Sequence, residues 1–272
     1  MQYLVRPPSA ALRHALSEHP NRDRIDPEQA LQQHQTYLAA LRAAGASLVE
    51  LPAEPDLPDA TFVWDTMLAL PRAGSEEPTA LVVLARPGEP SRRAEVPSVA
   101  ARLRALLPPT TPFHEIVAPG TLDAGDVIAY GRRLAIGESA RTNRQGAEQL
   151  AALARTLGYE PFVCPVTDRL HLASAISPLG PDLLIGTAAG FASLDASSPD
   201  AAPAGELRRL LIPDDELPGA NVLVAAGHAF VPAGNPVAVR LMRAAGLDVV
   251  EVPLDQFTRA DGGPTCLVGP VP

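Results

Sequence analysis

One cysteine and one histidine of this sequence lie in local settings that suit a chemical reaction. Cys266 follows two glycines and a proline in DGGPTC, and glycine lets a substrate approach the backbone closely. His171 lies between leucines in DRLHLASA. A cysteine thiolate is a nucleophile, whereas a histidine can protonate a leaving group and later activate water. The two side chains together are typical of nucleophilic catalysis.

Aspartates in two further motifs indicate which substrate such a thiolate would attack. Asp59 and Asp65 occur in PDATFVWD, and Asp123 occurs in GTLDAGDV. Carboxylates that face a thiolate repel it, so their presence favours a cationic substrate held between them. A guanidinium is planar, always charged and pairs bidentately with carboxylates. These residue types predict hydrolysis of a C–N bond in a guanidine or an amidine.

Each of these residues also has a purely structural explanation, which the sequence leaves open. Cys266 precedes apolar residues and suits a small core residue. His171 suits a buried, hydrogen-bonded histidine, and Asp123 suits a turn cap. Cys164, in FVCPV, is expected in the core.

Composition restricts the class of protein. The chain has 272 residues, of which 46% are apolar, so it can bury a substantial core without disulfides or metal. A net charge of −9 argues against nucleic acid or an anionic membrane as partner. No apolar run approaches the ~20 residues of a membrane span, and the N-terminus lacks the pattern of a secretory signal. We expect a cytoplasmic protein with a small-molecule substrate and neither a metal nor an organic cofactor, and a homodimer is compatible with the sequence.

Short strand-like and helical segments alternate along the chain, as in α/β proteins. The predicted strands are residues 47–51, 80–85, 126–130, 183–186 and 248–252, and the clearest helices are 27–44, 91–107, 145–157 and 236–245. Asp26 is the expected N-cap of the first helix, with Pro27 at its first position and Gly45 as its stop. Residues 71–78, PRAGSEEP, read as a solvated turn.

A repeat emerges when the helix ends are aligned. Residues 42–52, 155–165 and 243–253 each contain a helix end, a glycine, a short strand and a proline, and 104–119 is a weaker copy without the glycine. Repeats place equivalent loops on one face. Such prolines precede all of the reactive residues, Asp65, Asp123, His171 and Cys266. Copies arranged around an axis would therefore bring these residues together at one end of that axis.

The chain resembles the dimethylarginine dimethylaminohydrolase family of the guanidine-modifying superfamily. The motifs that carry the resemblance span nearly the whole sequence: LPDATFVWD (57–65), RPGEPSRRAE (86–95), TLDAGDV (121–127), RTNRQGAE (141–148), the leucine-flanked His171 and DGGPTC (261–266). The resemblance implies an α/β fold, the five-bladed α/β propeller (pentein fold) of ββαβ-type repeats around a central channel. It also implies that residues 1–272 form a single catalytic domain with pseudo-fivefold repeats.

The resemblance further implies a role for each matching residue. Cys266 matches the nucleophile and His171 the general acid and base. Asp123 matches the acidic residue that orients this histidine and holds the guanidinium, together with Asp65. The positions matching those that bind the rest of the substrate are Asp59, Arg92, Arg141, Leu16 on a lid loop, and the backbone of Ala260.

Trp64 departs from the family pattern, because the family has a glutamate before the residue that matches Asp65. One interpretation is altered substrate selection through a cation–π contact. The other, which we favour from the sequence, is an aromatic side chain packed beside the site.

The resemblance predicts hydrolysis of methylated arginine to citrulline and dimethylamine or methylamine, through a covalent thiouronium on Cys266. Arginine deiminase, agmatine deiminase and amidinotransferase share this chemistry. Arg92 and Arg141 favour a substrate that retains its carboxylate, which argues against agmatine. A non-catalytic guanidine-binding protein of the same fold is the alternative from another class.

Overall fold

The computed structural model describes residues 2–74, 81–167, 169–197 and 207–271. Within them the strands form five three-stranded sheets. The sheets consist of β1 (Gln2–Val5), β2 (Ser47–Glu50) and β15 (Gly269–Val271); β3 (Met67–Leu70), β4 (Leu81–Leu84) and β5 (Phe113–Glu115); β6 (Val127–Tyr130), β7 (Arg133–Glu138) and β8 (Glu160–Pro165); β9 (Ile176–Pro178), β10 (Leu183–Gly186) and β11 (Arg208–Leu211); and β12 (Leu223–Ala225), β13 (His228–Pro232) and β14 (Asp248–Val252). Of the predicted turn 71–78, residues 75–78 lie outside the described ranges.

All of these sheets share one topology. The first strand pairs antiparallel with the middle strand, and the middle strand pairs parallel with the last, as in β6, β7 and β8. The helices that precede the last strands are α1 (Pro27–Ala43), α2 (Val96–Leu106), α3 (Arg144–Thr156), α4 (Ala188–Asp195) and α5 (Pro236–Ala244), and a short α6 (Asp255–Thr258) follows β14. In one sheet the C-terminal β15 takes the first place and pairs with β1, which joins the two chain ends.

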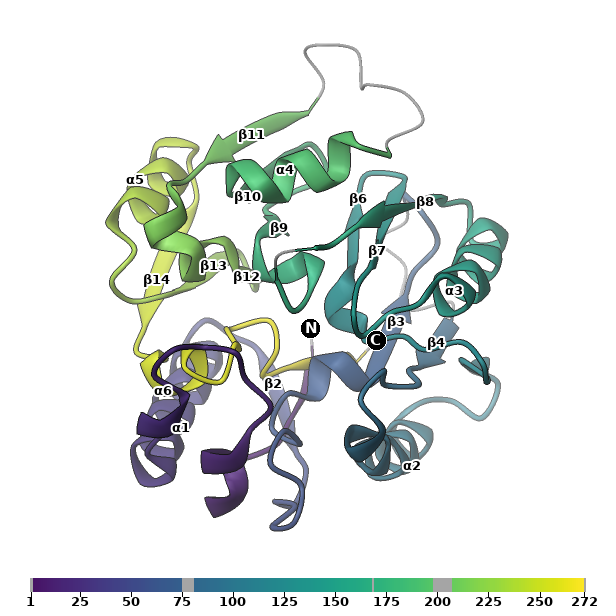
Figure 1. Cartoon of the computed structure of the whole chain (residues 1–272), viewed down its shortest axis with the longest axis horizontal. Helices are drawn as coiled ribbons and strands as arrows, with labels where there is room; N and C mark the ends of the chain where they lie inside the picture. The colour runs from purple at the N-terminus through teal and green to yellow at the C-terminus, as the bar shows by residue number, and fades with distance from the viewer. Residues whose placement is uncertain (1, 75–80, 168, 198–206, 272) are drawn as a thin grey trace.

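The sheets surround a central axis, with the longer helices at the periphery (Figure 1). The predicted five-bladed α/β propeller of ββαβ-type units is thereby confirmed for the part of the chain that is described. The predicted copies 42–52, 155–165 and 243–253 correspond to the ends of α1, α3 and α5 with the strands β2, β8 and β14.

The glycine of each such copy ends its helix. Gly45, Gly158 and Gly246 have φ values of 95°, 85° and 90°, a left-handed conformation that residues with a Cβ avoid. At the start of α1, the Asp26 carboxylate accepts hydrogen bonds from the backbone N–H groups of Glu28 and Gln29, as expected of an N-cap.

The helix predicted at 91–107 begins later than expected. Residues 90–95 form a 3-10 helix, and α2 starts at Val96 with Pro97 in its first turn. Proline lacks a backbone N–H and its ring clashes with the carbonyl four residues earlier, so it is tolerated only in the first turn of a helix.

Within the described residues, each apolar cluster joins a helix to its own sheet and to a neighbouring sheet. Val99 and Leu103 of α2 pack with Val82 and Leu84 of β4, for example. Cys164 on β8 is buried among apolar residues, as predicted. Because the apolar layers lie between helix and sheet, the loops at the axis are free to carry polar side chains. No helix in the described ranges is both long and apolar enough to cross a membrane.

Candidate active site

Four reactive side chains occupy corresponding places in four of the described sheets, just before the strand that opens each sheet. Asp65 lies two residues before β3, Asp123 four before β6, His171 five before β9 and Cys266 three before β15. Asp65, His171 and Cys266 line one buried space, and Asp123 contacts His171. The convergence expected from the repeat is therefore present in the structure.

His171 is buried between two carboxylates. Its Nε2 lies 3.1 Å from Asp123 Oδ2 and its Nδ1 lies 3.9 Å from Asp65 Oδ1. Burial lowers the pKa of His171, but the charges of Asp65, Asp126 and Asp123 and the hydrogen bond to Asp123 raise it to about 9. The imidazole is therefore a cation at neutral pH, with a proton to donate.

Asp123 is completely buried and is held from two sides. Gly88 donates its backbone N–H to Asp123 Oδ1 at 3.0 Å, and the other carboxylate oxygen faces His171. Burial acts to raise the pKa of Asp123, but the hydrogen bond and charge of His171 hold it below its ordinary value. The side chain makes no capping hydrogen bond to the 3-10 helix that follows it, so the turn-cap explanation is wrong.

A glycine lets the acidic and the basic groups approach each other. A Cβ on Gly125 would lie 2.7 Å from both Asp65 Oδ1 and His171 Nδ1. Real Cβ atoms do not come this close to other atoms, so glycine is required where the backbone passes between these two side chains.

Cys266 lines the same space and is half-buried. Burial and the charge of Asp65 raise the pKa of its thiol to about 11, against hydrogen bonds that lower it. The resting group is a thiol, and it becomes a thiolate when positive charge arrives beside it.

Arg92 is buried and bound by protein groups on three sides. Its Nε and Nη2 donate to the two carboxylate oxygens of Glu95 at 3.0 and 2.9 Å, and Nη1 donates to Asp65 Oδ2 at 2.7 Å. Nη2 also reaches the backbone carbonyls of Asp59 and Phe62. Arg92 thus fixes Asp65 in place and has little capacity left for a ligand. Sequence reasoning missed Glu95, although its position three residues after Arg92 was a signal for an ion pair.

Two buried polar atoms beside this space have no hydrogen-bond partner within the described ranges. One is the acceptor Asp65 Oδ1 and the other is the donor Arg141 Nη1. Arg141 Nη1 lies 3.9 Å from Asp123 Oδ2, beyond hydrogen-bond distance. Since unpartnered buried polar groups are costly, they mark where a ligand would supply the missing partners.

Asp126 links two parts of the site. Its carboxylate accepts from Ser139 Oγ at 2.7 Å and from the backbone N–H of Leu172 at 3.0 Å. Ser139 Oγ in turn accepts the backbone N–H of Arg141 at 2.9 Å. One buried carboxylate therefore links the loop of Arg141 to the segment of His171.

The space is closed on one side by the N-terminal segment. The backbone N–H of Leu16 donates to both oxygens of Asp59, at 3.2 and 3.3 Å, and Ser17 Oγ donates to the carbonyl of Arg259. Ala260 lies beside this contact and is buried. Burial raises the pKa of Asp59 despite the opposing charge of Arg92. The volume left is about 10 Å³, enough for about one water molecule, so a guanidine can enter only when some of the lining residues move.

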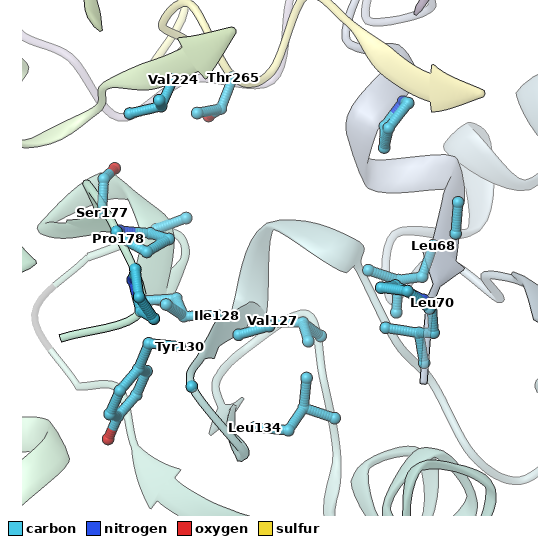
Figure 2. Close-up of a pocket in the computed structure, with 18 of the residues that line it drawn as sticks. Leu68, Leu70, Val127, Ile128, Tyr130, Leu134, Ser177, Pro178, Val224 and Thr265 are labelled. Carbon is cyan, nitrogen blue, oxygen red and sulfur yellow. The ribbon is translucent and has the colours of Figure 1, made fainter. Parts of the chain in front are cut away.

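Trp64 does not line this space. Its indole Nε1 donates to the carbonyl of Ala124 at 3.0 Å, and its ring lines a separate apolar pocket of about 540 Å³. We call this the axial pocket, because it lies between the first strands of the sheets; Leu68 and Leu70 of β3 and Ile128 of β6 point into it (Figure 2). The position is that of an aromatic side chain packed beside the site, the interpretation favoured from the sequence.

One group of residues has the spacing of metal ligands. Oxygen and nitrogen atoms of Asp65, Asp123 and His171 lie within 4.8 Å of one another. Two of these residues, Asp123 and His171, already form a hydrogen-bonded ion pair, which a metal ion would have to replace.

The chain matches no family model, but it is similar to characterised proteins over most of its length. It is 33% identical over 265 residues to the N(G),N(G)-dimethylarginine dimethylaminohydrolase of Streptomyces coelicolor, covering 97% of this chain and 94% of that protein. It is 31% identical over 242 residues to the enzyme of the same name from Pseudomonas aeruginosa, covering 89% of this chain and 88% of that protein.

Solved structures agree with these matches. A variant of the Pseudomonas aeruginosa DDAH complexed with citrulline superimposes with a TM-score of 0.84 at 28% identity, covering 98% of this chain and 97% of that one. The N-terminal domain of ArgZ, a cyanobacterial arginine dihydrolase, has a TM-score of 0.81 at 19% identity and shares the fold.

Proposed function

Because the chain belongs to the N(G),N(G)-dimethylarginine dimethylaminohydrolase family, we propose that it hydrolyses methylated arginine to citrulline and dimethylamine or methylamine. The observation that carries the proposal is the pair of unpartnered atoms in one buried space, the acceptor Asp65 Oδ1 and the donor Arg141 Nη1. A methylated arginine offers guanidinium N–H donors at one end and a carboxylate acceptor at the other. The relative crystallised with citrulline supports the same product.

The substrate is bound at both of its ends. Asp65 and Asp123 hold the guanidinium, and Arg141 binds the α-carboxylate. Asp59, with the backbones of Leu16 and Ala260, faces the α-amino group. Arg92 acts as a positioning residue for Asp65, because its guanidinium is taken up by Asp65 and Glu95.

Entry of the cation activates the nucleophile. The pKa of the Cys266 thiol, raised to about 11 by burial and by Asp65, falls when the guanidinium charge compensates that of Asp65. The thiolate then forms a bond to the central guanidinium carbon. His171, a cation by virtue of its pKa of about 9, gives its proton to the methylated nitrogen. The C–N bond breaks and the amine leaves, which converts the tetrahedral adduct into a thiouronium on Cys266.

Water completes the reaction. The neutral His171 takes a proton from water as its oxygen bonds to the carbon of the thiouronium. The C–S bond then breaks, releasing citrulline and restoring the thiolate. The remaining proton of the water passes through solvent to the free amine, and the proton that the Cys266 thiol released to solvent on activation returns to the sulfur when citrulline leaves. Asp123 stabilises the imidazolium in both half-reactions, because its Oδ2 lies 3.1 Å from Nε2.

A reactive, unpaired thiol at Cys266 suits a reducing compartment, so we include a cytoplasmic location in the proposal. Residues 1–272 would act there as one catalytic domain on a small-molecule substrate.

The test is citrulline release from asymmetric dimethylarginine, monomethylarginine, arginine and agmatine in parallel, with the parent protein and Cys266→Ser. We expect turnover of the methylated arginines by the parent alone. Preference for arginine or agmatine would reassign the enzyme to a deiminase. No citrulline from any of the four would overturn the proposal.

A further inference from the structure

The fifth sheet also places a polar side chain at the position that carries the reactive residues in the other four. Asn221 lies two residues before β12, the opening strand of its sheet, as Asp65 lies two residues before β3. The propeller geometry therefore directs Asn221 toward the same axis as the four residues described above. It is buried, with 6% of its surface exposed.

Asn221 contacts both of the segments that carry the nucleophile and the acid. Its Nδ2 lies 3.7 Å from Cys266 Sγ and 3.4 Å from the backbone carbonyl of Ala173, two residues after His171. Its Oδ1 accepts the backbone N–H and the hydroxyl of Thr265, at 3.1 and 3.0 Å. The side chain thus bridges the loop of Cys266 and the segment of His171.

These contacts determine the orientation of the amide. Two donors of Thr265 point at Oδ1, and a carbonyl acceptor points at Nδ2. A flipped amide would set its oxygen against the carbonyl of Ala173 and its NH₂ against the N–H of Thr265. The unflipped amide therefore keeps N–H groups on the side of the Cys266 sulfur. Gly263 allows this approach, since a Cβ there would lie 2.6 Å from the Asn221 amide.

We propose that Asn221 is a further catalytic residue, whose amide donates a hydrogen bond to Cys266 Sγ as the thiolate forms and again when the thiolate leaves the carbon. The inference rests on the nucleophilic role of Cys266 in the proposed function. A neutral donor suits this place, because it stabilises the thiolate without a positive charge that would repel the incoming guanidinium.

Alkylation of Cys266 by iodoacetamide tests the hydrogen bond without any need for turnover. The thiolate sulfur forms a bond to the methylene carbon as iodide leaves, so the rate follows the thiolate fraction. The rate is measured from pH 6 to 11 on the Cys266 peptide by mass spectrometry, which separates it from buried Cys164. Asn221→Ala removes the donor and should slow alkylation about tenfold at pH 8, as a rise of about one unit in the thiol pKa would.

Asn221→Asp keeps an acceptor for Thr265 but replaces the donor with a negative charge, which should raise the thiol pKa further. We expect the alkylation rates to fall in the order parent, Asn221→Ala, Asn221→Asp. Asn221→Ala separates the proposed role from a merely structural one. If Asn221 only holds the loop, Asn221→Ala will lose thermal stability but keep the pH profile of the parent, which would overturn the proposal. Equal rates for all three folded proteins would overturn it as well.

Asn235→Ala is the matched control. Asn235 is also a buried asparagine, and its Nδ2 donates to the carbonyl of Pro232 at 2.8 Å rather than to the Cys266 segment. The Asn235→Ala variant should have a lower thermal stability than the parent but the same dependence of the alkylation rate on pH. If the pH dependence of alkylation in Asn235→Ala shifts as far as in Asn221→Ala, the loss of any buried asparagine amide has the same effect. That result would contradict the proposal. Absence of citrulline release by the parent would reject the proposed function alone, because the alkylation order does not depend on turnover.

Discussion

His171 and Asp123 come from the openings of two different sheets, yet His171 Nε2 lies 3.1 Å from Asp123 Oδ2. Asp123 is completely buried and accepts a second hydrogen bond from the backbone N–H of Gly88. The pair is therefore an ion pair held away from water, and the charge of Asp65 further stabilises the imidazolium. It supplies the proton of the proposed reaction and also makes the site sensitive to pH.

Asp123→Asn should weaken catalysis by lowering the pKa of His171. The asparagine keeps the shape of the side chain but removes a negative charge that raises this pKa. We expect kcat to fall about 100-fold or more, the range of general acid catalysis, and the alkaline limit of activity to move to lower pH. Activity measured from pH 5 to 10, with an NMR titration of the imidazole, checks both. An unchanged pKa of His171 would refute the explanation.

The same pair predicts how stability depends on pH. The pKa of His171 is about 9 in the folded protein, above the value of about 6.5 in an unfolded chain. The raised pKa of His171 increases the free energy of unfolding. This contribution is complete below about pH 6.5 and is lost as pH rises toward 9. The loss should reach up to about 3 kcal/mol. Urea unfolding of the parent and of His171→Gln at pH 6 and 9 isolates it, because the difference between the two proteins should shrink at pH 9.

Gly125→Ala should displace side chains of the candidate active site and leave the rest of the fold intact. The added Cβ would lie 2.7 Å from His171 Nδ1 and Asp65 Oδ1, so one of these side chains must move. We expect loss of most citrulline release. Gly180→Ala is the control, since its Cβ would meet its nearest neighbour at 3.9 Å. Comparable activity in the two variants would contradict the required close approach.

Arg141→Ala and Arg92→Ala should affect different properties: the first should raise KM and the second should lower stability. Arg141→Ala removes a donor that has no hydrogen-bond partner among the described residues, so KM should rise between about tenfold and 100-fold while thermal stability changes little. Arg92→Ala leaves Asp65 and Glu95 buried without their cation and should cost about 3–5 kcal/mol of stability. Thermal unfolding and steady-state kinetics of both variants check this contrast; the reverse pattern would exchange the two roles.

The sequence by itself determined the repeating unit and the residues that converge. Helix end, glycine, strand and proline are local signals, because a left-handed glycine or an N-cap aspartate acts within a few residues of the chain. Once these three copies and the weaker one at 104–119 were aligned, the loops of Asp65, Asp123, His171 and Cys266 corresponded, so that copies arranged around an axis would bring them together.

Only the tertiary structure decided which way each side chain faces. Arg92 lines the candidate site, as expected, but its guanidinium also binds Glu95 and Asp65, and Trp64 faces the axial pocket. Asn221 escaped notice because no aligned copy of the repeat precedes its loop, and because its partners Ala173 and Cys266 are more than 40 residues away in sequence. Contacts between sheets depend on how the five units close into a ring, and no local pattern records that closure.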